Sequence, residues 1–110
     1  MTVSYTHLDV YKRQLPYEKA LAKYDRKTTL FYLDPPYYAR KLYRYNLSHD
    51  DFVGMAERLR GLKGKFVLSL NDVPEVRAIF GKFHIRGIEL AYTAQKTAGR
   101  RFREVLITNF

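Results

Sequence analysis

The chain has 110 residues, which by length is one domain at most, large enough to bury a single core but not two. Hydrophobic residues make up 46% and charged residues 28%, a composition typical of folded globular chains; cysteine is absent, which excludes disulfides and thiolate metal sites, and no apolar run is long enough to span a membrane. Twenty Lys and Arg against 11 Asp and Glu give a formal net charge of +9, which favours a polyanionic partner without requiring one.

The first segment, residues 1–14, shows neither a helical nor a strand period and ends in Lys12-Arg13-Gln14. It is similar to a translated adapter or vector tail of the kind attached to fragmentary reading frames, and a natural N-terminal arm is the alternative. We therefore treat residues 1–14 as a non-native tail and residues 15–110 as the domain.

A helix is predicted from Pro16, because proline suits a first turn and Tyr17, Leu21 and Tyr24 follow at helical spacing. The next run, residues 29–33, is β-rich and almost wholly apolar. That pattern is typical of a parallel strand buried beneath helices on both faces. The strand should stop at Asp34, since two prolines follow it.

A second helix is predicted after Ser48, which forms a capping-box pair with Asp51. His49, beside this cap, is interpreted as structural rather than catalytic. The apolar face of the helix comprises Phe52, Met55, Ala56, Leu59 and Leu62.

The remaining elements alternate between strand and helix and then change character. A buried strand over residues 65–70 precedes a short helix with Pro74 in its first turn. Two strands follow, residues 83–92 with a bulge expected at Gly87 and residues 102–110, joined by a basic loop. Because no helix separates them, they should pair antiparallel. The fold class is α/β, with a parallel portion and an antiparallel end.

The most informative motif is Asp34-Pro35-Pro36-Tyr37, directly after a buried strand. Ligands of open α/β sheets bind at that edge. Asp34 offers a carboxylate acceptor, the Pro35 carbonyl a second acceptor, and Tyr37 a flat ring for stacking. The set suits an exocyclic amino group on a planar base, and the alternative is a plain strand-ending turn.

At this point the chain resembles the Dam-type, adenine-specific DNA methyltransferases, which transfer a methyl group from S-adenosylmethionine to the N6 amine of adenine. The resemblance covers nearly all of residues 15–110, and Asp at the first motif position is what the DNA-adenine enzymes carry. It rests on four blocks: Phe31–Tyr38, Leu47–Phe52, Lys63–Asp72 and Glu104–Asn109.

The resemblance implies the C-terminal half of a Rossmann-like, S-adenosylmethionine-dependent methyltransferase sheet, in a cytoplasmic enzyme encoded by a bacterium or phage. It also implies double-stranded DNA with a flipped adenine as partner and no metal. The catalytic set would be Asp34, Pro35, Pro36 and Tyr37, with Asp34 also touching the cofactor. Nucleic-acid contacts are expected from Tyr38, Lys41, Arg44, Arg100, Arg101 and Arg103. For each of these cations taken alone, a solvated surface charge is the favoured alternative.

The chain lacks two parts of the family's catalytic domain. No glycine precedes Gly54, so the glycine-rich cofactor loop is missing, and the target-recognition segment is missing as well. The chain is therefore expected to be a partial catalytic domain, inactive alone, with an open sheet edge beside residues 29–33. The alternatives are a small basic nucleic-acid-binding module without catalysis and an amino-methyltransferase acting on RNA or protein. The recognition sequence, and a restriction, phage or housekeeping origin, stay open.

Overall fold

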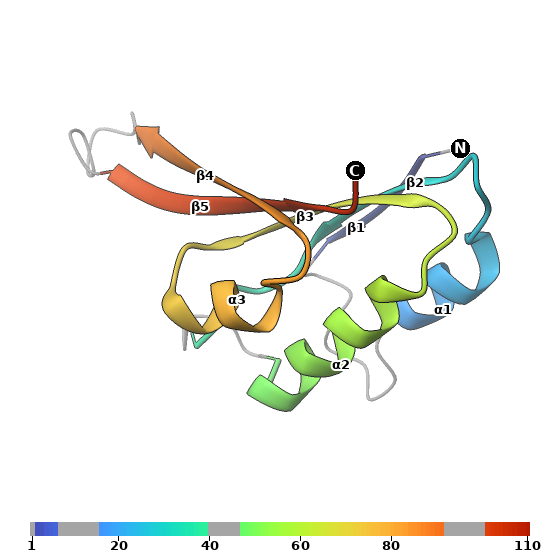
Figure 1. The fold of residues 1–110 in the computed structure, drawn as a ribbon, viewed down its shortest axis with the longest axis horizontal. Coiled ribbons are helices and arrows are strands. Elements are labelled where there is room, and N and C mark those ends of the chain that lie inside the picture. The colour runs from blue at the N-terminus through green and yellow to red at the C-terminus, as the bar shows by residue number, and fades with distance from the viewer. Residues whose placement is uncertain (1, 7–15, 40–46, 92–100) are drawn as a thin grey trace.

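The computed structural model describes residues 2–6, 16–39, 47–91 and 101–110 (Figure 1). The α/β prediction is confirmed, because strands and helices alternate and then give way to two consecutive strands. In chain order the elements are β1 (Thr2–Thr6), α1 (Pro16–Tyr24), β2 (Leu30–Asp34), α2 (His49–Arg60), β3 (Lys65–Asn71), α3 (Pro74–Ile79), β4 (His84–Ala91) and β5 (Arg101–Thr108).

The strands form one five-stranded sheet in the order β1-β2-β3-β5-β4. The pairs β1–β2 and β2–β3 are parallel, and β5 runs antiparallel to both β3 and β4. The predicted parallel portion with an antiparallel end is therefore confirmed. Since β2 and β3 are parallel neighbours, their carboxyl ends, at Asp34 and Asn71, meet at one edge, which we call the carboxyl edge.

The expectation of an open edge beside β2 is wrong. Strand β1 pairs in parallel along the whole of β2, from Thr2 opposite Leu30 to Thr6 opposite Asp34. An unpaired strand edge leaves a row of N–H and C=O groups without partners, and the run Thr-Val-Ser-Tyr-Thr has high β propensity. Part of the segment set aside as a tail thus belongs to the sheet.

The prediction of helices on both faces of the sheet is also wrong. The three helices of the described residues, α1, α2 and α3, all lie on one face (Figure 1). Along β2, Phe31 and Leu33 face the helices and are fully buried, whereas Tyr32 between them is 41% exposed. An aromatic side chain tolerates such a half-wet position, so an apolar run did not by itself establish burial on both sides.

The hydrophobic core lies between that face and the helices. Each large apolar side chain buried there contributes about 1.5–3 kcal/mol relative to exposure. The predicted helical faces are confirmed, with Leu62 partly buried at the margin. The sheet supplies Phe31, Leu33, Phe66, Leu68, Leu70, Val105 and Ile107, and the helices supply Tyr17, Leu21, Phe52, Met55, Ala56, Leu59 and Val76.

Helix α2 begins where the sequence predicted. The Ser48 hydroxyl accepts from the Asp51 backbone N–H at 3.1 Å, and the Asp51 carboxylate accepts from the Ser48 N–H at 2.8 Å. This reciprocal capping box satisfies two amide donors that the helix itself cannot. It also places His49 as the first helical residue.

The opposite end of the sheet, which we call the amino edge, is tied together by side chains that bind backbone groups. The Asp25 carboxylate accepts from the N–H groups of Lys63, at 3.0 Å, and Gly64, at 2.8 Å. The Asn109 amide accepts from the Phe66 N–H at 3.0 Å and donates to the Gly64 carbonyl at 2.9 Å. These bonds fix where β3 starts relative to the loop before β2 and the end of β5.

The predicted bulge at Gly87 is wrong, because β4 and β5 pair without interruption from His84 opposite Thr108 to Ala91 opposite Arg101. Glycine suits position 87 for a different reason, which is the close approach of another side chain. A Cβ at Gly87 would lie 3.2 Å from a guanidinium nitrogen of Arg77 and 3.8 Å from a carboxylate oxygen of Asp72. The missing side chain therefore makes room for the Arg77 side chain against β4.

In the part of the chain that the structure describes, no helix is long and apolar enough to cross a membrane.

Candidate functional site

The motif that ends β2 lies at the carboxyl edge. Pro35 and Pro36 are buried, whereas the Asp34 and Tyr37 side chains are only partly buried. Asp34 is the last residue of β2, and the prolines that follow cannot extend the ladder. Buried prolines fix the backbone between two side chains that solvent can still reach, as a ligand site at a sheet edge requires.

Glu104 of β5 holds the Tyr37 side chain. The Tyr37 hydroxyl donates to Glu104 Oε2, although the two residues lie 67 positions apart in the chain. Glu104 is paired with Asn71 in the sheet register, so β5 brings it to the carboxyl edge. A phenol anchored at its hydroxyl is held at both ends of the ring axis, so the position of the ring is restricted, which lowers the entropy lost when a planar ligand stacks on it.

Asn71, at the end of β3, binds the backbone of Tyr38, the residue that follows Tyr37. Its amide oxygen accepts from the Tyr38 N–H at 2.8 Å, and its amide nitrogen donates to the Tyr38 carbonyl at 3.0 Å. Asn71 is only 7% exposed, so loss of these bonds would leave polar groups shielded from water. After Tyr38 the chain turns through Ala39 at φ 58°, a left-handed conformation that costs an alanine about 1–2 kcal/mol.

Tyr38, predicted as a nucleic-acid contact, packs against α2. Its hydroxyl lies 2.6 Å from His49 Nδ1, and its ring centroid lies 5.4 Å from that of Phe52. The side chain is partly buried against the core. Together with the Asn71 bonds, these contacts fix the loop that follows β2 to both β3 and α2.

The predicted basic contacts are only partly within the described residues. Lys41, Arg44 and Arg100 lie outside them. Arg101 is the first residue of β5, and its side chain lies outside the described part as well. Arg103 is exposed on β5, two residues along the strand. The structure therefore places one of the five predicted cations, Arg103, next to the carboxyl edge.

An ion pair that sequence reasoning missed lies beside this edge. Arg77 Nε donates to Asp72 Oδ1 at 2.7 Å, and Arg77 Nη2 donates to Asp72 Oδ2 at 3.0 Å. The hydrogen bond from Arg77 lowers the pKa of Asp72 below its ordinary value, with a smaller contribution from the charge of Arg103. The same hydrogen bond raises the pKa of Arg77, so both groups are charged across the ordinary pH range.

Sequence reasoning also missed the two residues that hold the loop, Asn71 and Glu104. Both lie inside the blocks that carry the family resemblance, but nothing local distinguishes an asparagine that ends a strand from one that begins a turn. A polar residue at the end of a buried strand was the available signal, since its partner must come from the same edge.

Among the described residues, no group of three or more His, Asp or Glu side chains lies close enough together to hold a metal ion. The connection from β1 to α1 is where a βαβ unit would hold a nucleotide-like cofactor. Residues 7–15 contain no glycine, so they do not fit the glycine-rich cradle that S-adenosylmethionine requires in the family resembled.

A scan against protein-family models and a search of curated proteins each found no match to this chain.

Proposed function

We propose that this chain is the adenine-binding part of an enzyme that methylates the N6 amine of adenine in DNA. The observation that carries the proposal is the arrangement at the carboxyl edge. A carboxylate ends a parallel strand, two buried prolines follow, and the next ring is anchored through its hydroxyl. The net charge of +9 supports a nucleic-acid partner.

Asp34 is the proposed acceptor for the adenine amine. A neutral exocyclic amine is a poor nucleophile because its lone pair is delocalised into the ring. Hydrogen bonds from its two N–H groups to the Asp34 carboxylate and the Pro35 carbonyl would localise that lone pair. Such bonds position and polarise the amine without a covalent intermediate.

Tyr37 is the proposed stacking surface. Exposing the amine requires the adenine to leave the duplex, which costs a few kcal/mol. Stacking on an aromatic ring returns about 1–3 kcal/mol per base. Because Glu104 holds the Tyr37 hydroxyl, the ring keeps its position before the base arrives.

No methyl-transfer step is assigned to this chain, because residues 7–15 do not fit the cofactor. We expect the purified chain to bind S-adenosylmethionine weakly and to leave DNA unmethylated. Incubation with labelled cofactor and adenine-containing DNA measures this, and label transfer above background would contradict it.

The second candidate function is nucleic-acid binding without an amino-group site. It is favoured by the lack of glycine in residues 7–15, which do not fit the cofactor. The two functions differ at Asp34, since a plain binding module gains nothing from a carboxylate beside its stacking ring, whereas an adenine site depends on it.

A binding measurement on the chain as it stands separates the two functions. One DNA duplex carries an adenine opposite an abasic site, and a second carries purine, which lacks the amino group, at the same position. A hydrogen bond to a charged group is worth about 1.5–3 kcal/mol, so we expect the adenine duplex to bind at least about tenfold more tightly. Fluorescence anisotropy at fixed salt gives both dissociation constants.

Substitution of Asp34 completes the test. Asp34→Ala should reduce the adenine-to-purine ratio to the smaller value that the Pro35 carbonyl alone supports, even if total affinity rises with the lost negative charge. Asp50→Ala is the matched control, because it removes an exposed carboxylate from the first turn of α2 and should leave the ratio unchanged. Equal binding of both duplexes by the unsubstituted chain would exclude an adenine-specific site and leave nucleic-acid binding without an amino-group site as the function.

A further inference from the structure

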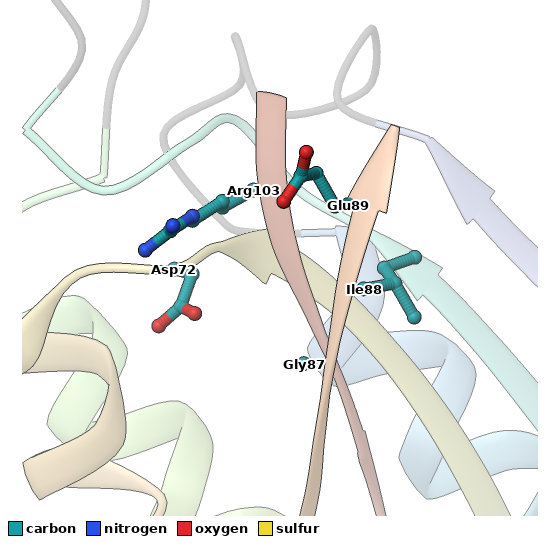
Figure 2. A pocket seen from close by; sticks show the side chains of 5 residues that line it. All are labelled: Asp72, Gly87, Ile88, Glu89 and Arg103. Carbon is teal, nitrogen blue, oxygen red and sulfur yellow. The ribbon is translucent and has the colours of Figure 1, made fainter. Parts of the chain in front are cut away.

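Beside the proposed adenine site, the structure contains a second arrangement of fixed donors. Asp72 directly follows Asn71, the residue that holds the Tyr38 backbone. A cavity of about 220 Å³ opens here, lined by Asp72 and Arg103 together with Gly87, Ile88 and Glu89 of β4. Figure 2 shows the Arg103 and Asp72 side chains extending to the same side of β5, while Ile88 extends to the opposite side.

The Arg77 guanidinium is fixed in its plane from two directions. The Asp72 carboxylate binds Nε and Nη2, at 2.7 Å and 3.0 Å. The backbone of β4 at Gly87 approaches Nη2 so closely that a Cβ there would lie 3.2 Å from it. An arginine held in this way has already lost much of its rotamer freedom, so binding a further ligand costs less side-chain conformational entropy.

One edge of this guanidinium stays available. Asp72 uses the edge formed by Nε and Nη2, and no described residue accepts from Nη1. The Arg77 side chain is 48% exposed. The edge formed by Nη1 and Nη2 can therefore donate two parallel hydrogen bonds to a pair of coplanar acceptors.

The local charge decides which acceptors suit that edge. The Asp72 carboxylate that binds Arg77 offsets the positive charge of the guanidinium. The formal charge of this ion pair is zero, so the pair itself offers little net attraction for a phosphate group. A neutral pair of acceptors with fixed geometry fits better, and the N7 and O6 atoms of guanine form such a pair in the major groove.

We propose that Arg77, held by Asp72 over Gly87, reads a guanine in the DNA near the adenine bound at Asp34. This inference rests on the proposed function, because it requires the same DNA to lie along the carboxyl edge. It assigns to the chain a specificity-determining residue on α3, in addition to the proposed base-binding site.

The experiment selects bound DNA from a pool of duplexes that carry one unpaired adenine within randomised flanking sequence. The unsubstituted chain should enrich guanine at one fixed distance from the adenine. Arg77→Met should abolish that enrichment. At the enriched position, replacing guanine by 7-deazaguanine, which lacks the N7 acceptor, should weaken binding by the unsubstituted chain about tenfold and should not weaken binding by Arg77→Met.

Two further variants separate recognition from charge and from folding. Gly87→Ala keeps every charge but places a methyl group against the guanidinium, which must shift by a few tenths of an ångström, so it should weaken the guanine enrichment. Arg60→Met removes an exposed arginine that pairs with Glu57 at 3.3 Å on α2, and it should keep the enrichment. Thermal unfolding of each variant confirms that it is folded.

Each outcome bears on a different claim. No guanine enrichment by the unsubstituted chain, with the adenine preference intact, overturns the role of Arg77 alone. A uniform loss of affinity in Arg77→Met across all sequences, with a shallower salt dependence, identifies a phosphate contact and also overturns it. Failure of the unsubstituted chain to bind any of these duplexes would contradict the proposed function as well.

Discussion

An asparagine binds backbone groups at each of the two edges of the sheet, but the other polar contacts of the two edges differ. At the amino edge, Asn109 binds a backbone N–H and a backbone carbonyl, as Asn71 does at the carboxyl edge. At the amino edge a carboxylate, that of Asp25, also binds backbone N–H groups. The carboxyl edge adds bonds between side chains instead: Tyr37 with Glu104, Tyr38 with His49, and Arg77 with Asp72.

The difference indicates that the amino edge serves mainly stability and the carboxyl edge mainly binding. Bonds to backbone fix where strands and loops begin, so changes at the amino edge should alter stability alone. Bonds between side chains orient rings and charged groups that solvent can reach. Changes to the bonds between side chains at the carboxyl edge should therefore alter binding, with smaller effects on stability.

The largest effect should come from Gly64→Ala at the amino edge. A Cβ there would lie 2.6 Å from the Thr29 carbonyl oxygen and 2.8 Å from that of Arg26, and both belong to backbone that cannot simply move aside. We expect a loss of about 3 kcal/mol in the free energy of unfolding, measured by urea denaturation. The folded fraction should keep its adenine-to-purine ratio, and a changed ratio would contradict the division between the edges.

The asparagines allow a matched comparison. Asn71→Ala and Asn109→Ala each remove two hydrogen bonds to backbone, and each should cost about 2 kcal/mol of unfolding free energy. Only Asn71→Ala should also reduce the adenine preference, because it releases the loop that carries Tyr37. An equal effect of both variants on binding would show that the loss is merely one of stability.

Tyr37→Phe should have a smaller effect. It removes the hydroxyl that Glu104 accepts but keeps the aromatic ring, so the expected cost is about 1 kcal/mol of unfolding free energy. Adenine binding should weaken less than in Tyr37→Ala, which loses the stacking surface as well. Indistinguishable binding by Tyr37→Ala and the unsubstituted chain would exclude a stacking role.

The smallest effect concerns the acid stability of the exposed ion pair. Because Arg77 lowers the pKa of Asp72 in the folded chain, the stabilisation is present above the ordinary carboxyl pKa of 3.8 and is lost as pH falls through the folded value. Thermal midpoints measured from roughly pH 5 to pH 2 should fall slightly less for Arg77→Met than for the unsubstituted chain. An equal fall would show that the pair contributes nothing to stability.

Local patterns predicted the local structure well. The Ser48 cap, the apolar face of α2, the proline that opens α3 and the strand that ends at Asp34 all depend on neighbours within a few residues. Periodicity and capping carry that information directly.

Long-range contacts explain what the sequence did not predict. The partner of Tyr37 lies 67 positions away, and that of Tyr38 lies 33 positions away. Gly87 looked like a bulge because its neighbour, Arg77, comes from another element. The exposed face of β2 also depended on where helices elsewhere in the chain would pack.

The central claim is that an unpaired adenine binds at the carboxyl edge, and backbone amide NMR shifts test it most directly. On titration with the adenine-bearing duplex, and relative to the purine duplex, the amide signals of Asp34, Tyr37 and Tyr38 should move. Those of Lys63, Gly64 and Phe66 at the amino edge should stay unchanged. Differential shifts confined to the amino edge or to the exposed sheet face around Tyr32 would contradict the account.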